Sequence, residues 1–415
     1  MTEPEEEKKQ GNDSNRDGTA EELTAGRLPD PYRFLDGSYV ETPEDWERRA
    51  KELRQIYQKS MYGVWRDGTE EKAEYKLDGG SVRITIACRE RSASFTASVL
   101  VPDVALCEMP EGGWPVIVGM HGNIQEKFAA ENGYASVILN TYEIASDDNN
   151  HKGAFYELYP YGKEPEEQTG VLMAWAWGAS KVLDILEAGL GKELCISAEN
   201  SIVTGVSRWG KAAAVCGAFD TRFKLTAPSC SGAGGLAVYR YTSEGRTYDF
   251  STKEGPEGYT YGQNEPLGSL QAEGEQGWFN DRFLSFSDVE ELPVEQYMLA
   301  ALCADKCRYL FIIASCIHED WVNAPSMYLC YKAARSVYGF LGLEDHIAVN
   351  IHKEGHAVIW EDMRYLMDYF NLHVYGKKPG LDLSSLTSSV FEEEANYDPF
   401  FDSFSYGWHR PALDL

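Results

Sequence analysis

One short stretch constrains the fold of this chain more than any other, because a strand pattern changes to a helix pattern at a single serine. A β-branched run leads into Gly205 and Ser207, and the alanines at 212–214 begin a helix pattern at once. Such a sharp strand-to-helix turn presents a serine as a nucleophile, usually with glycines two residues before and two after it. Here the second glycine comes one residue late, at Gly210. The stretch predicts a nucleophilic Ser207, with a buried serine in an ordinary turn as the alternative.

Strand and helix patterns alternate along most of the chain. Short apolar runs typical of buried strands precede Ser207 and also occur at 114–120, 134–139, 223–227, 308–315 and 347–351. Helix patterns lie between or after them, at 169–186, 326–341 and 360–369. Alternation of this kind favours a parallel sheet that is covered on both faces. We therefore predict an α/β-hydrolase fold, a three-layer αβα sandwich with a mostly parallel central sheet.

The chain divides into a polar tail and one large domain. Residues 1–30 are acidic and lack aromatic residues, so we expect a disordered tail that cannot offset its chain entropy by burial. Residues 31–415 are expected to form a single catalytic domain, with an irregular insertion over the sheet at about 239–290. The tail lacks the apolar core of a signal peptide, which leaves the location of the protein open.

The charge balance argues against two classes of partner. The formal net charge is −28, with 38 Lys and Arg residues against 66 Asp and Glu residues. Nucleic acids and anionic membrane surfaces both require clustered basic side chains, which this chain lacks. No apolar run is long enough to span a bilayer. We therefore expect no nucleic-acid partner and no membrane insertion.

The cysteines do not indicate a metal site. There are nine, an odd number, and no two of them form a C-x-x-C pair. Cys303 and Cys307 are four residues apart in a helix-like segment, without a second pair to complete a zinc site. We therefore expect no metal and no cofactor, and disulfides are not indicated.

A serine nucleophile needs a histidine, and one histidine of this chain has the right place. A neutral imidazole must accept the serine proton, and a carboxylate must hold the imidazole in the correct tautomer. In this fold they follow in the order serine, acid, histidine, in loops at the carboxyl ends of strands. Of the eight histidines, His356 alone lies in a glycine-containing loop after the last predicted strand. We predict His356 as the base, against a capping or packing histidine as the alternative.

The acid is sought between the serine and the histidine. The end of the strand at 308–315 offers Glu319 and Asp320, which could equally be solvated loop carboxylates. The strand after Ser207 ends without a carboxylate, in the stretch 228–232. Spacing alone does not choose between Glu319 and Asp320.

The serine stretch resembles a known family. Gly205-Val206-Ser207-Arg208-Trp209-Gly210-Lys211 is similar to the G-x-S-R-x-G-K signature of the glucuronoyl esterases, carbohydrate esterase family 15, in which the late glycine is usual. Further similar stretches lie at 169–180, 231–235, 278–279, 292–299, 319–321 and 355–356. The resemblance covers residues 95–376. It implies the α/β-hydrolase fold, Ser207 as nucleophile and His356 as base.

The resemblance implies roles for four more side chains. Arg208 would place its guanidinium beside the developing oxyanion, together with backbone N–H groups. Lys211 would hydrogen-bond sugar hydroxyls, and Glu265 and Trp321 would line a glucuronate pocket. Without the resemblance, Lys211 would be interpreted as a surface lysine on a helix and Glu265 as a loop carboxylate.

Two departures from the family pattern bear on the acid and on a disulfide. Many members carry the acid after the strand that follows the nucleophile, where this chain has Cys230, and a thiol cannot replace a carboxylate. In such members the acid lies two residues before a tryptophan, so the resemblance favours Glu319 over Asp320. Fungal members bridge two positions that are Val206 and Ala357 here, so this disulfide cannot form, as in bacterial-type members.

The resemblance thus implies a serine carboxylesterase for esters of (4-O-methyl-)D-glucuronic acid. Such esters link glucuronoxylan to lignin alcohols, and they would be hydrolysed through an acyl-enzyme by a secreted or cell-surface protein, which we expect to be a monomer. An acetyl xylan esterase or another carbohydrate esterase of the same fold is one alternative. A non-catalytic carbohydrate-binding relative is another, and Ser207, His356 and Glu319 argue against it.

Overall fold

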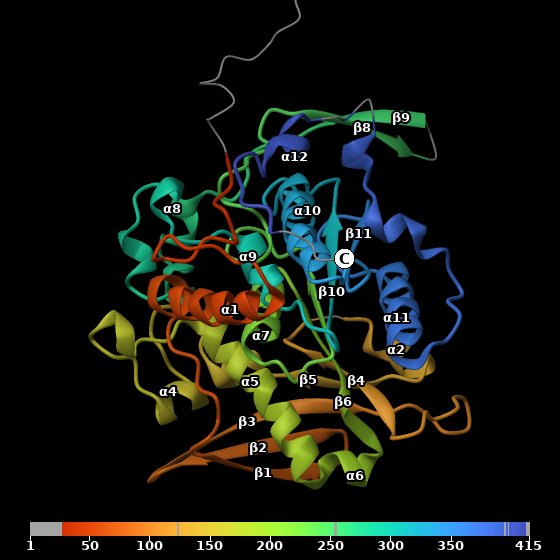
Figure 1. Cartoon of the computed structure of the whole chain (residues 1–415). Helices are drawn as coiled ribbons and strands as arrows, with labels where there is room; N and C mark the ends of the chain where they lie inside the picture. The colour runs from red at the N-terminus through yellow and green to blue at the C-terminus, as the bar shows by residue number, and fades with distance from the viewer. Residues whose placement is uncertain (1–26, 123, 253–254, 394–395, 397, 412–415) are drawn as a thin grey trace, which may run out of the picture.

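A nine-stranded sheet runs through the centre of the molecule (Figure 1). The computed structural model describes residues 27–122, 124–252, 255–393, 396 and 398–411. From edge to edge the strands are β1 (Glu71–Asp78), β2 (Ser81–Cys88), β3 (Arg91–Leu100), β5 (Ala135–Leu139), β4 (Trp114–Gly119), β6 (Ile196–Val206), β7 (Leu225–Ser229), β10 (Tyr309–Ser315) and β11 (Ile347–His352).

The strand directions confirm the predicted, mostly parallel sheet. β1, β2, β3 and β5 pair antiparallel in turn. From β5 across to β11 all neighbours are parallel. The carboxyl ends of β4, β6, β7, β10 and β11 therefore share one edge, where open α/β sheets bind their ligands.

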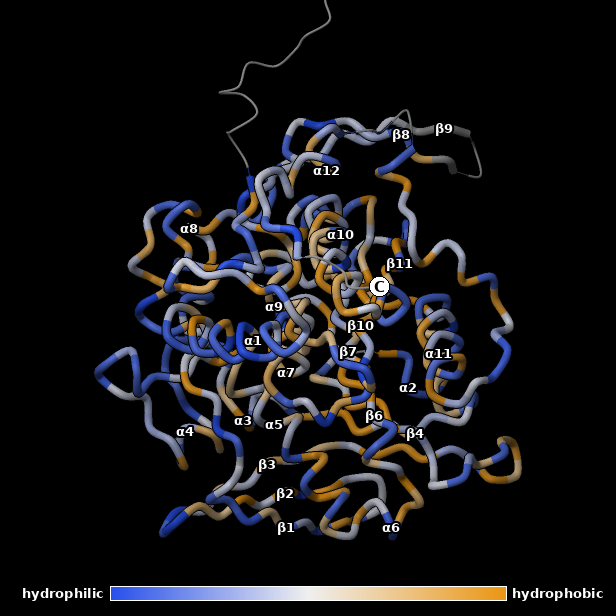
Figure 2. The backbone as a smooth tube through the Cα atoms, viewed as in Figure 1, coloured by the Kyte–Doolittle hydropathy of each residue, from blue (hydrophilic) through white to orange (hydrophobic). Residues whose placement is uncertain are grey.

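Helices cover both faces of the sheet, which gives the three predicted layers. One face is packed by α1 (Pro43–Tyr57), α5 (Val171–Ile185), α7 (Arg208–Phe219), α9 (Gln296–Ala301) and α10 (Ala324–Phe340). The other face is packed by α2 (Glu126–Glu131) and α11 (Trp360–Tyr375). Successive strand residues alternate between the layers, as Val116 and Ile117 do on β4. Figure 2 shows the hydrophobic positions gathered along these central strands.

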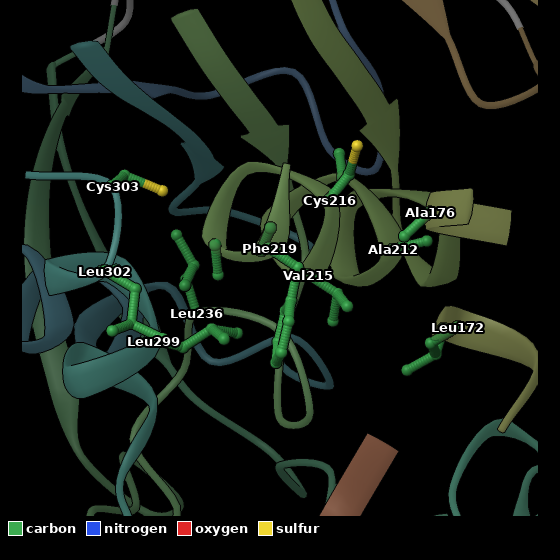
Figure 3. Packing of buried hydrophobic residues seen from close by; sticks show 14 of the residues in the cluster. Leu172, Ala176, Ala212, Val215, Cys216, Phe219, Leu236, Leu299, Leu302 and Cys303 are labelled. Carbon is green, nitrogen blue, oxygen red and sulfur yellow. The ribbon is translucent and has the colours of Figure 1, made fainter. Parts of the chain in front are cut away.

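Small side chains bring α5 and α7 close together. Ala176 of α5 and Ala212 of α7 are both fully buried, and α7 continues with further buried alanines. Figure 3 shows these residues in one layer with Leu236 and Leu299. The tight packing fixes the position of α7, and Ser207 is the residue immediately before its first turn.

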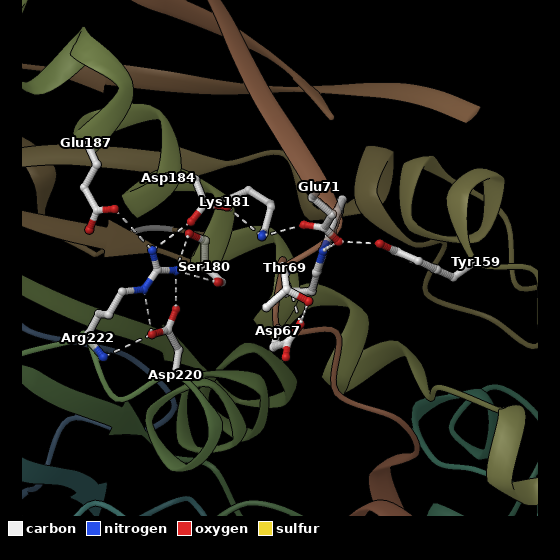
Figure 4. A network of polar contacts seen from close by, with 11 residues as sticks. Asp67, Thr69, Glu71, Tyr159, Ser180, Lys181, Asp184, Glu187, Asp220 and Arg222 are labelled. Carbon is white, nitrogen blue, oxygen red and sulfur yellow. Dashed lines mark hydrogen bonds and ion pairs between the residues drawn. The ribbon is translucent and has the colours of Figure 1, made fainter. Parts of the chain in front are cut away.

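The antiparallel end of the sheet is joined to α5 through a buried carboxylate. Glu71 on β1 accepts hydrogen bonds from Lys181 at 2.6 Å and from Trp177 at 2.8 Å. Lys181 also contacts Asp184, which is paired with Arg222 (Figure 4). The charges of this network are all paired, so it supports the sheet edge rather than a ligand site.

Shorter segments fill the connections. They are η1 (Gln58–Tyr62), α3 (Thr141–Ile144), α4 (Ala154–Leu158), η2 (Pro165–Glu167), η3 (Leu186–Leu190), α6 (Gly191–Leu194), α8 (Leu267–Leu270), η4 (Gln276–Trp278), η5 (Phe283–Ser285), η6 (Val289–Glu291), η7 (Leu383–Thr387), η8 (Val390–Glu392) and α12 (Phe400–Ser403). None of the helices within the described part of the chain has the length and apolar composition needed to cross a membrane.

Two predicted features differ from the structure or lie outside it. The segment 239–290 contains a hairpin, β8 (Thr247–Thr252) with β9 (Gly255–Thr260), which the sequence did not indicate because Gly and charged residues interrupt its aromatic alternation. The hairpin packs through Tyr248 on Phe391, with ring centroids 5.1 Å apart. The predicted disordered tail lies, up to residue 26, outside the described residues.

Candidate active site

Ser207 lies in a strained turn between β6 and α7. Its φ of 63° and ψ of −129° are unusual for a residue other than glycine. The Ser207 N–H donates to the Ser229 carbonyl at 3.0 Å, and the Lys211 N–H donates to the Ser207 carbonyl at 2.9 Å. Strain of this kind is found where a side chain must be presented for chemistry.

The glycines beside this turn are required by close backbone approach. A Cβ on Gly205 would lie 2.5 Å from the Trp209 carbonyl oxygen. A Cβ on Gly210 would collide with the Ser229 carbonyl oxygen on β7. The late glycine therefore stands where α7 approaches β7.

His356 and Glu319 lie within ion-pair distance of each other. The Nδ1 atom of His356 lies 2.9 Å from Oε2 of Glu319, which is 7% exposed whereas the imidazole is 41% exposed. His356 follows β11, and Glu319 follows β10. A carboxylate beside Nδ1 favours the proton on that nitrogen, which leaves Nε2 as the acceptor of the ring.

Asp320, the other candidate acid, has a different partner. Its Oδ1 accepts a hydrogen bond from the Tyr259 hydroxyl at 2.7 Å. The structure thus brings Glu319, and not Asp320, to His356. Among the described residues the Ser207 hydroxyl has no hydrogen-bond partner, and in unliganded enzymes such bonds often form only when substrate binds.

Cys230 lies close to both the Ser207 turn and the His356–Glu319 pair. It follows Ser229, whose carbonyl holds the Ser207 N–H, and its sulfur lies within 4.8 Å of the facing atoms of Glu319 and His356. Burial, with the charge of Glu319, raises the pKa of the Cys230 thiol to about 12. The thiol is therefore neutral and does not compete with Glu319 for the imidazole.

The same three side chains are of types that bind zinc. Two ligands on a tetrahedral zinc lie about 3.3 Å apart, given metal–ligand bonds near 2 Å. The 2.9 Å between His356 and Glu319 is shorter than this and has the length of a hydrogen bond. The spacing therefore fits an acid–base pair better than a metal site.

Arg208 is held beside the serine by Asp147, which the sequence did not single out, and by Trp278. Its Nη1 lies 2.8 Å from Oδ2 of Asp147, and its guanidinium carbon lies 5.1 Å from the Trp278 ring centre. The Trp278 indole N–H donates to the other Asp147 oxygen at 2.7 Å. Asp147 lies in a long polar connection, and Trp278 lies in the stretch 278–279 that resembles the family. No local pattern in the sequence indicated that these two side chains would meet.

Lys211 and Glu265 form a buried ion pair. The ammonium donates to Oε2 of Glu265 at 2.7 Å and to the Ala233 carbonyl at 2.6 Å, and both side chains are 3% exposed. Gly232 lies against this pair, since a Cβ there would be 2.7 Å from the same Glu265 oxygen. Neither residue has the solvated surface position that the sequence alone would give it.

Trp321 and Glu265 share a cavity next to this pair. The Glu265 N–H donates to the Trp321 carbonyl at 2.9 Å, and the Trp321 ring is exposed. Both line a cavity of about 220 Å³ together with Asn264 and Thr242. An exposed indole face beside polar side chains is a surface on which a sugar ring can stack.

Glu275 is a further side chain that the sequence analysis missed. Its Oε2 is buried without a hydrogen-bond partner among the described residues. Burial, followed by the negative charge of Glu265, raises the pKa of Glu275, while Lys211 and Arg208 act in the opposite direction. A buried acceptor near the two cations is available for a ligand hydroxyl.

Two turns can supply backbone N–H donors next to Ser207. The first N–H groups of α7, beginning with Arg208, have no partner within the helix. The loop after β4 contains His121, whose φ of 106° is unusual and whose ring centre lies 4.6 Å from that of Trp209. In this fold an oxyanion hole is made by the residue after the nucleophile and by this kind of loop.

Comparison with known proteins assigns the family. A family model described as "Glucuronyl esterase, fungi" matches residues 84–342. A multidomain esterase of Ruminococcus flavefaciens is 52% identical over 389 residues, which are 92% of this chain and 50% of that protein. A 4-O-methyl-glucuronoyl methylesterase of Hypocrea jecorina is 31% identical over 77% of this chain and 64% of its own length. This chain thus spans about half to two thirds of these relatives.

A solved structure agrees with the sequence relatives. The carbohydrate esterase family 15 glucuronoyl esterase from Caldicellulosiruptor kristjansonii superposes with a TM-score of 0.80 and 37% identity, over 90% of this chain and 96% of that one. The catalytic domain of the Hypocrea jecorina glucuronoyl esterase gives a TM-score of 0.70 at 26% identity, over 88% and 92%. The α/β-hydrolase fold is confirmed, and this chain belongs to the glucuronoyl esterases of carbohydrate esterase family 15.

Proposed function

We propose that this chain is a serine carboxylesterase that hydrolyses esters of (4-O-methyl-)D-glucuronic acid. The observation that carries the proposal is the 2.9 Å contact between His356 and Glu319, on the same sheet edge as the strained Ser207 turn. Membership of the family supports it, as does the buried Lys211–Glu265 pair next to Trp321. We also propose that residues 31–415 act as one monomeric domain, without a metal, a cofactor or a nucleic-acid partner.

The acylation step follows from the tautomer of His356. With Nδ1–H facing Glu319, Nε2 accepts the Ser207 proton as the hydroxyl attacks the uronate carbonyl carbon. The imidazolium that forms is stabilised by the Glu319 carboxylate. The same proton then passes to the leaving alcohol, and the C–O ester bond breaks to give a glucuronoyl ester on Ser207.

The tetrahedral oxyanion is stabilised by groups already in place. The Arg208 guanidinium is held by Asp147 and Trp278, so little reorganisation is needed when charge develops. The backbone N–H groups at the start of α7 add neutral donors. Deacylation repeats the sequence with water, from which His356 takes the proton, and it releases glucuronic acid.

The sugar is recognised beside the reacting carbonyl. Lys211 donates to ring hydroxyls while Glu265, at 2.7 Å, holds its ammonium group in place. Glu275 accepts from a hydroxyl through its unpartnered oxygen. Trp321 packs its exposed indole on the apolar face of the ring. An acetyl ester would make none of these contacts with the sugar.

The test uses benzyl D-glucuronate with the wild-type protein and Ser207→Ala. Release of benzyl alcohol by the wild type, lost by about 10³-fold or more in Ser207→Ala with an unchanged melting temperature, supports the proposal. Equal rates for the two proteins would remove Ser207 from the reaction. No release by either would favour the non-catalytic carbohydrate-binding alternative, for which binding of glucuronoxylan fragments is then measured.

A further inference from the structure

The loop that carries His356 is exposed, although its histidine must be placed accurately. It comprises residues 353–359, between β11 and α11. The His356 imidazole is 41% exposed and its ion-pair partner is Glu319. A displacement of about 1 Å at a catalytic group can reduce the rate by as much as 100-fold. The backbone of this loop therefore needs a fixed support.

A second histidine, His352, contacts the backbone of this loop at two positions. It is the last residue of β11 and its side chain is 5% exposed. Its Nδ1 accepts the Glu354 N–H at 3.2 Å, and its Nε2 lies 3.1 Å from the Ala357 carbonyl oxygen. These two residues flank His356, so one imidazole ring is bonded to the backbone on both sides of the catalytic base.

Only one form of the His352 ring can make both bonds. Nδ1 must be unprotonated to accept from Glu354, and Nε2 must carry the proton to donate to Ala357. This is the neutral Nε2–H tautomer, the opposite of the tautomer in His356. Burial lowers the pKa of His352, which favours this neutral form.

Asp362 supports the same arrangement from α11. It is fully buried, and its Oδ2 lies 3.6 Å from Nε2 of His352 and accepts the Ile359 N–H at 2.8 Å. Its Oδ1 accepts from the Asn350 amide at 2.7 Å, so the carboxyl joins β11 to the end of the loop. His352 and Asp362 also line a cavity of about 760 Å³.

We propose that His352 is a positioning residue for the catalytic base, because its ring fixes the backbone on both sides of His356. It touches no substrate and acts only through His356. The inference rests on the proposed role of His356 as base, and it adds to the triad a support that lies outside it.

The test compares three substitutions. His352→Phe keeps an aromatic ring in the site but removes both hydrogen bonds. His352→Gln keeps an amide donor that can reach the Ala357 carbonyl. His373→Phe is the matched control, since burial also lowers the pKa of His373, on α11, which has aromatic neighbours and, in the described part of the structure, no hydrogen bond to residues 353–359. For each, kcat and KM on benzyl glucuronate and the melting temperature are measured.

The expected result separates positioning from packing. In His352→Phe kcat falls roughly tenfold with KM within about twofold, and His352→Gln recovers at least about threefold of that loss. His373→Phe retains wild-type kinetics. Wild-type kcat in His352→Phe overturns the inference, and so does an equal loss in the Phe and Gln variants, or a loss that follows only the melting temperature.

A second measurement distinguishes failure of this inference from failure of the proposed substrate. An organophosphorus fluoride reacts with an activated serine through phosphorus–oxygen bond formation and loss of fluoride, whatever the natural ester. The inactivation rate should fall by the same factor in His352→Phe as kcat does. If the wild type hydrolyses no glucuronate ester but this rate still depends on His352, the substrate assignment fails and the positioning role stands.

Discussion

Glu319 and Asp320 are chain neighbours that serve different partners. His318, before them, has a φ of 57°, and this turn directs Glu319 to His356 at 2.9 Å while Asp320 accepts from Tyr259 at 2.7 Å. In the proposed mechanism, the carboxylate at position 319 holds the imidazole tautomer. The distinction comes from one backbone turn and not from the chemistry of the two side chains.

Substitution of each acid by its amide tests this distinction. Glu319→Gln should lower kcat on benzyl glucuronate by roughly 10³-fold, because an amide no longer favours the Nδ1–H tautomer or the imidazolium. Asp320→Asn, the matched control, should stay within about threefold of wild type because it keeps an acceptor for Tyr259. The reverse order of effects would assign the acid to Asp320.

At the residue scale the sequence predicted the side chains that carry a motif. Ser207, Arg208 and Lys211 lie in one stretch, and His356 was identified by its loop. Asp147 and Glu275 were missed because they reach the site from separate connections, and their roles depend on burial and on partners distant in sequence. The position of an acidic residue in the sequence indicates neither its burial nor its distant partners.

At the scale of helices and strands, the turn between β6 and α7 depends on a glycine. Gly210 lies so close to β7 that any side chain collides with the Ser229 carbonyl. The geometry of this turn is therefore set by packing between α7 and β7.

The apolar runs of the central strands were predictable because both of their faces are buried, whereas the β8–β9 hairpin is not part of that sheet.

Gly210→Ala should displace α7 and with it Ser207. We expect a loss of roughly 1–3 kcal/mol in the free energy of unfolding, as for overpacked cores, with a lower kcat. Gly268→Ala is the control, since a Cβ at Gly268 meets no atom within 4 Å. Denaturant unfolding and kinetics of both variants check the expectation, which an unchanged Gly210→Ala protein would contradict.

The start of α11 should give the molecule a pH-dependent stability. Burial raises the pKa of Asp362 from 3.8 to about 7, so the folded state keeps a proton that the unfolded chain releases at lower pH. Because the folded state binds more protons between these values, stability falls as pH rises from 3.8 to about 7. At about 1.4 kcal/mol per pKa unit, the decrease reaches at most about 4 kcal/mol.

Asp362→Asn removes this titration. The free energy of unfolding, measured from pH 4 to pH 8, should lose part of its downward slope in the variant, whatever its absolute stability. Asp382→Asn is the control, because hydrogen bonds from Ser384 lower the pKa of that exposed carboxyl and place its titration below the window. Parallel curves for wild type and Asp362→Asn would refute the assignment.

At the scale of the whole molecule, the first described residues form hydrogen bonds with residues near the end of the described chain. The Leu28 N–H donates to the Phe404 carbonyl, the Trp408 indole donates to the Leu28 carbonyl at 2.8 Å, and the His409 N–H donates to Asp30 at 2.7 Å. Tyr32 packs on Phe340 of α10. Contacts between ends of a chain cannot be inferred from local patterns.

Two truncated chains test this closure. A chain that starts at residue 42 should melt well below one that starts at residue 27, because it loses the buried side chains of Leu28, Tyr32, Phe34 and Val40. At about 1.5–3 kcal/mol per buried apolar side chain, the loss for these four is roughly 6 kcal/mol or more. Equal melting temperatures in calorimetry would show that these contacts contribute little.

The most direct test of the account is the substrate preference of the intact protein. We compare kcat/KM for benzyl D-glucuronate with kcat/KM for benzyl acetate, which has the same leaving alcohol but lacks the sugar that Lys211, Glu275 and Trp321 are proposed to bind. The account predicts a preference of at least about 100-fold for the glucuronate ester, lost with Ser207→Ala. Faster hydrolysis of the acetate, with Ser207 still required, would contradict a uronate esterase and favour an acetyl esterase of the same fold.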